Sequence, residues 1–472
     1  MAAAVSLPTL TGGAVERVRR SGMLDLLLAV GVLLSLGRFL ATALGYGIPA
    51  WFSEELPPLI GLLAHGEPIT AIDVRQYGVV TFLVYDPAVR LLGPDLHPLA
   101  AYGLVVSLVA SLAALILIAR HLFAGHRRDA LVLALLWLNF VPLLYVVAQR
   151  MVDAWQLLFL SAAFVLFSNS SASPRWRRLA GVPLALAAMT KILPALLLVY
   201  LLIRDWRAGV LSLAVVGALL GVGQALYGTL MGFGYPVWLL SSGGGTVAAW
   251  STHYENNSLR GLIYKAAAGF RLEPDTKTYV LAAEWQPFLN ALSYALAFAL
   301  VGYLLLVAWR SRSAASPRRR AIELGLAFVT MLLVSPHTAH DYTAVMLPVI
   351  ALWIALWRCG APRAWARPLV VASALSAFLI GVFLPMSVMA RLIPIDALLA
   401  ATHNAANVYF AGDPIGRGIG AYDFLGFPGV GLLLAWGVMA VLEHQSRRAV
   451  PESAGVPLAD TVRPEIAVLG ST

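Results

Sequence analysis

The sequence has little charge and very little cysteine or lysine. Charged residues make up 12% of the 472-residue chain and hydrophobic residues 60%, and the mean hydropathy is +0.80. Soluble globular domains are about 25% charged. This composition therefore excludes an ordinary soluble domain and indicates a protein whose solvent is the lipid bilayer.

The scarce residue types exclude several kinds of site. The single cysteine, Cys359, excludes an internal disulfide and a cysteine-based metal site. Of the 33 basic residues only Lys191, Lys265 and Lys277 are lysines. The net charge of +9 does not indicate nucleic acid binding, because the arginines lie in short segments between apolar runs, where anionic headgroups and topology account for them.

Apolar runs are what the sequence has in abundance. A membrane helix needs about 20 apolar residues. Such runs, three of them short, lie near residues 23–45, 98–121, 129–148, 154–168, 208–231, 286–309, 321–335, 343–357, 368–390 and 424–443. The stretch 77–93 is apolar enough to lie along the membrane surface as an amphipathic element.

The arginine clusters lie in segments between the apolar runs, and one orientation of the chain places all of these segments on the same side of the membrane. They contain Arg17, Arg19, Arg20, Arg127, Arg128, Arg175, Arg177, Arg178, Arg204, Arg207, Arg310, Arg312, Arg318 to Arg320, Arg358, Arg363, Arg367, Arg447 and Arg448. The positive-inside rule makes these segments cytoplasmic. Residues 46–97, 232–285, 336–342 and 391–423 then form loops on the outer side.

One segment, 179–203, has arginines immediately before and after it. If both flanks are cytoplasmic, the segment enters the membrane and returns as two short helices that meet near Lys191 and Pro194. Irregular backbone at membrane depth is tolerated only inside protein or beside a wet cavity. The sequence thus predicts an all-α polytopic membrane protein of about twelve transmembrane helices, two of them short and paired as a hairpin.

This pattern divides the chain into three parts. Residues 1–22 form a basic cytoplasmic N-terminus, residues 23–443 a single transmembrane domain, and residues 444–472 a disordered cytoplasmic tail. Acids, histidines and amides gather in the outer loops, which indicates a polar catalytic or binding pocket on that side.

Several motifs occur in an order that resembles glycosyltransferase family 87, over roughly residues 50–350. They are the acidic pair after the first run, Met189-Thr190-Lys191-Ile192-Leu193-Pro194 followed by Arg204-Asp205-Trp206-Arg207, Asn256-Asn257-Ser258-Leu259-Arg260-Gly261, and Ser335-Pro336-His337 with His340. The resemblance implies a polyprenyl-phosphate-sugar-dependent enzyme of the C-type glycosyltransferase superfamily, whose actinobacterial members include mannosyltransferases of lipoglycan synthesis.

The chain departs from the family pattern at two places. The family's aspartate in the first loop is replaced by a choice of Glu54 and Glu55, and its polar turn before the fourth span reads Gln149-Arg150-Met151-Val152-Asp153. The transfer needs a carboxylate to accept the proton of the acceptor hydroxyl. Glu54 is the first candidate for this base, Glu55 the second and Asp73 the third, the last also a candidate for acceptor binding or a structural role.

The leaving polyprenyl phosphate needs fixed cations near the bilayer surface. Lys191, Arg260, His337 and His340 form the available set. Asn257 is a candidate for binding the sugar hydroxyls, or for capping a short helix that begins at Ser258. These residues need no metal or other cofactor.

The sequence therefore predicts a hexosyltransferase, expected to transfer mannose with inversion at the outer face of the plasma membrane. Its expected partners are a polyprenyl-phosphate-linked sugar, a glycolipid, lipoglycan or polysaccharide acceptor, and the bilayer. A multi-pass transporter or lipid-linked-sugar flippase is the alternative, although the two halves show no repeat. A transferase acting on protein or on lipid A is a further alternative within the superfamily.

Overall fold

The computed structural model describes most of the chain. The described residues are 12–45, 56–66, 77–169, 173–231, 251–273, 277–312, 316–358, 366–381, 397, 400–402 and 420–448. Every named element within these ranges is a helix. The predicted all-helical architecture is confirmed there.

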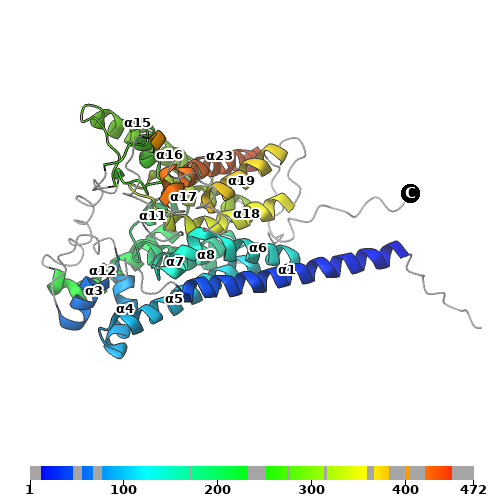
Figure 1. Ribbon diagram of the computed structural model, residues 1–472, viewed down its shortest axis with the longest axis horizontal. Coiled ribbons are helices and arrows are strands. Elements are labelled where there is room, and N and C mark those ends of the chain that lie inside the picture. Colours follow the sequence, from blue (N-terminus) through cyan, green and yellow to red (C-terminus); the bar gives the residue numbers. More distant parts are fainter. Residues whose placement is uncertain are drawn as a thin grey trace, which may run out of the picture.

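The helices of the described residues are shown in Figure 1. Their bounds are α1 Gly12–Gly45, α3 Leu56–Ile60, η1 Gly61–His65, α4 Val79–Leu92, α5 Leu96–Leu122, α6 Arg127–Asn139, α7 Val141–Ala148, α8 Asp153–Ser168, α9 Pro174–Arg178, α10 Gly181–Ala188, α11 Ala195–Arg204, α12 Trp206–Tyr227, η3 Gly228–Met231, α15 Leu259–Ala267, α16 Gln286–Arg310, α17 Pro317–Val334, η4 Asp341–Met346, α18 Leu347–Arg358, α19 Ala366–Gly381 and α23 Phe427–Arg448.

Six helical segments of the described residues are long and apolar enough to cross a membrane: Gly22–Gly45, Leu96–Leu122, Trp206–Tyr227, Gln286–Arg310, Asp341–Arg358 and Phe427–Arg447. Helices α6 and α7 form a seventh if their pair, bent by 57°, is one span. The membrane class is thus confirmed, whereas twelve spans are not established by the described residues. The predicted runs 154–168 and 321–335 correspond to α8 and α17, and the described part of the run 368–390 lies in α19. Residues 77–93, predicted to lie along the membrane surface, contain α4.

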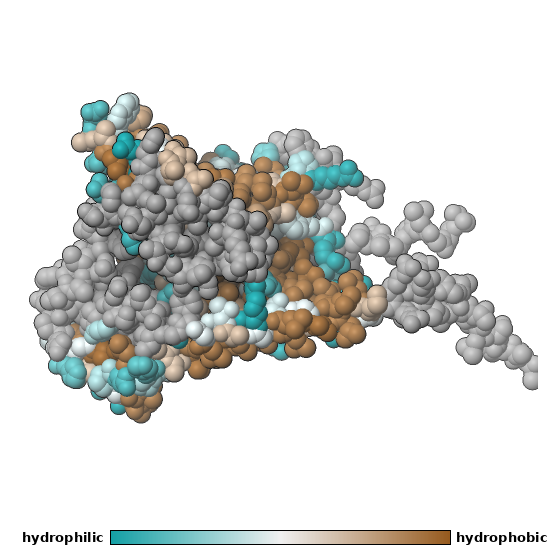
Figure 2. Space-filling model, viewed as in Figure 1, coloured by the Kyte–Doolittle hydropathy of each residue, from teal (hydrophilic) through white to brown (hydrophobic). Residues whose placement is uncertain are grey.

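The bundle has a lipid-facing outside and a closely packed inside. Leu33 and Leu34 of α1 are about two-thirds exposed, and hydrophobic residues cover the molecule along α1 in Figure 2. Such surface is stable in lipid because it need not face water. Helices α17 and α18 lie at the centre instead, and Trp353 of α18 is fully buried.

Ion pairs join the helices at one end of the bundle, which we call the arginine end. They are Arg128 with Asp25, Arg358 with Asp129, Arg204 and Arg319 with Glu323, and Arg319 and Arg447 with Glu443. The side chains of Glu323 and Glu443 are fully buried. Five arginines of the predicted clusters, Arg128, Arg204, Arg319, Arg358 and Arg447, are therefore paired at this end of the described bundle, and in Figure 1 the N-terminal end of α1 lies on that side.

Residues 179–203 form the predicted hairpin. Helix α10 has 8 residues and α11 has 10, about 12 and 15 Å at 1.5 Å per residue, so neither crosses a hydrocarbon core of about 30 Å. A Cβ placed on Gly181 would lie 2.4 Å from the carbonyl oxygen of Ala208. The two flanks of the hairpin therefore lie together, and its turn, with Lys191, points away from the arginine end.

Candidate active site

The turn that carries Lys191 is held by the chain just before α4. The backbone N–H groups of Gly78 and Val80 donate to the carbonyls of Thr190 and Met189, each over 3.0 Å, and the Thr81 hydroxyl donates to Thr190 over 3.1 Å. A side chain at residue 78 would collide with Met189, whose carbonyl oxygen lies 2.1 Å from an ideal Cβ. Glycine is therefore needed here for close approach of the two backbones.

Lys191 lies in a buried cluster of opposite charge. Its Nζ is 3.2 Å from a carboxylate oxygen of Asp153, at the start of α8, and 3.9 Å from one of Asp341, at the start of η4. The same ammonium is 3.8 Å from the centroid of the Tyr342 ring. Three segments far apart in the sequence thus converge on one cation, which is stabilised by charge and by the face of an aromatic ring.

The 336–342 loop reaches this cluster because Asn256 holds it. The Asn256 Oδ1 accepts hydrogen bonds from the backbone N–H groups of Thr338 and Ser258, and its Nδ2 donates to the Pro336 carbonyl. The loop then turns the ring of His337 edge-on to Tyr342, with centroids 5.9 Å apart. Lys191 and His337 therefore contact the same ring.

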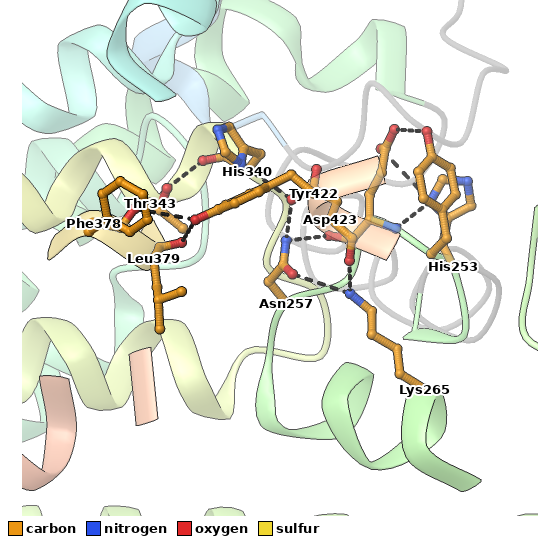
Figure 3. A network of polar contacts seen from close by, with 11 residues as sticks. His253, Asn257, Lys265, His340, Thr343, Phe378, Leu379, Tyr422 and Asp423 are labelled. Atoms are coloured by element: carbon orange, nitrogen blue, oxygen red, sulfur yellow. Dashed lines mark hydrogen bonds and ion pairs between the residues drawn. The ribbon is translucent and has the colours of Figure 1, made fainter. Parts of the chain in front are cut away.

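A second polar network adjoins the first and centres on Asp423 (Figure 3). One oxygen of Asp423 accepts from Asn257 Nδ2 at 2.8 Å and lies 3.2 Å from His340 Nδ1. Lys265 donates to Asn257 Oδ1 and to the Asp423 carbonyl. His340 precedes Asp341 in the chain, so one loop belongs to both networks.

Burial changes the proton affinities of the groups around Asp423. It lowers the pKa of Lys265 from 10.5 to about 7, although Asp423 and Glu255 oppose the change. It lowers the pKa of His253 to about 4, helped by the charges of Lys277 and Lys265. Burial and the charge of Asp423 raise the pKa of Glu255. Taking charged groups out of water disfavours their charged forms, which accounts for all three directions.

The chain matches one protein family over part of its length. The family model of glycosyltransferase family 87 matches residues 88–336, just over half of the chain. The chain belongs to glycosyltransferase family 87. Comparisons with curated proteins and with solved structures return no match. Family membership makes the protein a membrane glycosyltransferase, and the matched region contains Asp153, Lys191 and Asn257.

The fold of the glycosyltransferase brings together most of the predicted site residues that lie within the described ranges. Lys191, His337, His340 and Asn257 lie in the two adjoining networks. Arg260 is not joined to Lys191: its guanidinium contacts Tyr264 of α15, and Asn290 and Tyr294 of α16. The predicted bases Glu54 and Glu55, and also Asp73, lie outside the described residues.

Asn257 does not cap α15. Ser258 is the N-cap, and its hydroxyl accepts from the Gly261 N–H. The Asn257 amide is instead turned toward Asp423, which leaves sugar binding as the prediction for this residue. Among the described residues, His, Cys, Asp and Glu side chains form no group of three that could hold a metal ion.

Sequence reasoning missed Asp153, Asp341, Asp423 and Lys265 as members of the site. Asp153 ends the unusual polar turn at 149–153, and Asp341 follows His340 directly, so both carried a signal in their position. Lys265 was one of only three lysines. Nothing local to Asp423 distinguished it from the other acids of the outer loops, because its partners are 158 and 166 residues away.

Proposed function

We propose that this glycosyltransferase transfers mannose from a polyprenyl-phosphate-linked donor to a glycolipid, lipoglycan or polysaccharide acceptor. We further propose that the reaction takes place at the outer face of the plasma membrane and inverts the configuration at the anomeric carbon of the sugar. The observation that carries it is the convergence of Lys191, His337 and His340 at the end of the bundle opposite the arginine end. Grouped cationic and hydrogen-bonding side chains suit a phosphate whose negative charge grows as it leaves.

The reaction needs few parts. The acceptor hydroxyl attacks the anomeric carbon, the bond from that carbon to the phosphate oxygen breaks, and a carboxylate takes the hydroxyl proton. We assign acceptance of the hydroxyl proton to Glu54, with Glu55 as the alternative. We assign binding of the donor phosphate to Lys191, His337 and His340. Arg260 stays a predicted phosphate contact, and Asp73 a predicted acceptor contact.

Lys191 is not a free cation in this site. Asp153 and Asp341 lie within 4 Å of it, so an incoming phosphate shares the ammonium with two carboxylates. The phosphate therefore needs further hydrogen-bond donors, and the histidines of the 336–342 loop are adjacent and suited to that role.

The direct test is transfer by the purified enzyme in nanodiscs. It would be incubated with a panel of polyprenyl-phosphate sugars and candidate acceptors, and the release of polyprenyl phosphate would be measured. Release with a mannosyl donor, dependent on acceptor, is the expected result. Transfer only from a nucleotide-linked sugar, or movement of the lipid-linked sugar across the bilayer without cleavage, would contradict the proposal.

Isosteric variants test the base. Glu54→Gln is expected to slow transfer by at least about 100-fold, the lower bound for loss of a general base, while donor binding persists. Glu55→Gln is its matched control and should have a smaller effect, since neighbouring side chains point in different directions. If Glu55→Gln is the inactive variant, the two roles exchange. If both turn over normally, Asp73 becomes the candidate.

A further inference from the structure

His340 has one ring nitrogen engaged and the other presented inside the protein. Its Nδ1 lies 3.2 Å from Asp423 Oδ1, and the residue is only 2% exposed. The buried Nε2 has no hydrogen-bond partner within the described part of the chain. Leaving a buried polar atom without a hydrogen bond is unfavourable, so this nitrogen is suited to a ligand atom that completes the site.

Asp423 is itself held in place. The same oxygen that faces His340 accepts from Asn257 Nδ2 at 2.8 Å, and Lys265 bonds both the Asn257 side chain and the Asp423 backbone. Figure 3 shows these contacts on one side of His340. The His340 ring also packs on Tyr422 in a T-shaped arrangement, with centroids 6.3 Å apart. The carboxylate and the imidazole therefore cannot rotate independently.

We propose that Asp423 is the positioning residue of the donor-phosphate site and acts through His340. This inference rests on the proposed function and deepens it. Asp423 accepts the Nδ1–H, which fixes the ring orientation and aims Nε2 at a phosphate oxygen of the polyprenyl-phosphate-linked donor. A carboxylate that holds one nitrogen of a histidine both orients the ring and stabilises its doubly protonated form.

The charge balance of the transfer explains the arrangement. When the bond between the sugar carbon and the phosphate oxygen breaks, the phosphate gains one negative charge, and the acceptor proton passes to the catalytic carboxylate. When His340 carries a second proton on Nε2, that N–H can donate a hydrogen bond to the leaving phosphate. Asp423 then balances the positive charge of the imidazolium ring. The charges of Asp423 and His340 act on Glu255, the charge of Glu255 acts on Asp341, and Lys265 donates to the Asp423 carbonyl.

A double-mutant cycle tests the coupling. Asp423→Asn keeps the shape of the side chain and is expected to lower kcat/KM for the donor about 10- to 100-fold, as when a residue that orients a histidine ligand is lost. In a His340→Gln background the same change should cost less than about twofold, because the residue it positions is absent. A further tenfold loss in that background would show that Asp423 acts elsewhere and overturn the inference.

The matched control is Tyr279→Phe. The Tyr279 hydroxyl donates to the carbonyl of Phe424, next to Asp423, over 3.1 Å, so the variant loosens the same segment without touching His340. Its kcat/KM should stay within about twofold of the parent enzyme. If Tyr279→Phe is as impaired as Asp423→Asn, the loss reports on the fold of this segment and the positioning role fails.

A spectroscopic experiment tests the same inference without requiring the enzyme to transfer sugar. The chain has nine histidines, and ¹⁵N labelling with His340→Gln as reference identifies the ring signals of His340. Polyprenyl phosphate added to the parent protein should shift the Nε2 signal, and the shift should shrink in Asp423→Asn. An unmoved signal overturns the inference even if sugar transfer is found, whereas a shift without any transfer supports it and rejects only the proposed reaction.

Discussion

At the scale of single residues, the environment of Lys191 changes what a substitution there would report. From sequence, Lys191 is expected to affect transfer with little loss of folded protein. The structure places Asp153 and Asp341 against it, both nearly fully buried. Removing one member of a buried ion pair leaves an uncompensated charge, so stability and activity fall together in the single variant.

A paired substitution separates the two effects. Lys191→Met is expected to lower the free energy of unfolding by about 3–5 kcal/mol, whereas Lys191→Met with Asp153→Asn should recover much of that loss. Transfer should remain low in both, because the phosphate has lost its ammonium. Thermal unfolding in detergent and donor-dependent transfer are the measurements. Recovery of transfer in the double variant would remove Lys191 from the phosphate site.

Lys265 gives stability a pH dependence. The unfolded chain holds the Lys265 proton up to about pH 10.5, and the folded protein only to about 7. Between these values the unfolded state binds more protons, so stability rises with pH across this window and stays at its lower level below pH 7. The unfolding temperature of the parent protein minus that of Lys265→Met should therefore increase from pH 7 to 10. A constant difference would show that Lys265 keeps its proton.

At the scale of elements, the contact between residues 77–81 and the hairpin turn positions Lys191. Gly78→Ala would force a methyl group against the Met189 carbonyl, and because that atom belongs to the backbone the turn must move. We expect transfer to fall at least about tenfold, since misplacing a catalytic group by about 1 Å can cost 100-fold. Gly217→Ala on α12, with open space around residue 217, is the control. Equal activity of the two variants would show that the turn tolerates displacement.

The hairpin was predictable from sequence, whereas the packing of the turn was not. Arginines on both sides of 179–203 leave few topologies, because charge bias sets orientation. The bond from Gly78 to Thr190 joins residues 112 positions apart, and no local pattern in the sequence encodes such a contact. The same holds for Asp153, which only the fold brings to Lys191. The histidine loop was found because two histidines in a short polar segment between apolar runs are locally conspicuous.

At the scale of the whole molecule, the two ends of the bundle differ in chemistry. The arginine end consists of ion pairs between helix ends, and the opposite end holds the two networks of the site. The sequence predicted this polarity from charge alone, but not the pairs within it, such as Arg204 with Glu323, which are 119 residues apart.

Accessibility of single cysteines tests the orientation. In a Cys359→Ala background, Glu284→Cys, at an exposed position just before α16, should react with an impermeant thiol reagent added to intact cells. Ser173→Cys, exposed beside α9 at the arginine end, should react only after the membrane is opened. Thr338 is a poorer reporter because it is fully buried. The reverse pattern would place the site on the cytoplasmic side.

The length of α8 sets how deep the site lies. From Ser168, at the arginine end, to Asp153, beside Lys191, the helix has 16 residues, a rise of about 24 Å. A hydrocarbon core is about 30 Å thick, so if α8 stands along the membrane normal with Ser168 at one boundary of that core, Lys191 falls several ångströms short of the other boundary. In that orientation, a lipid-linked donor reaches Lys191 only if the bilayer thins around the protein or the donor phosphate lies below the headgroup plane. We therefore expect the rate of transfer to depend on the thickness of the bilayer as well as on the substrate concentration, through hydrophobic mismatch.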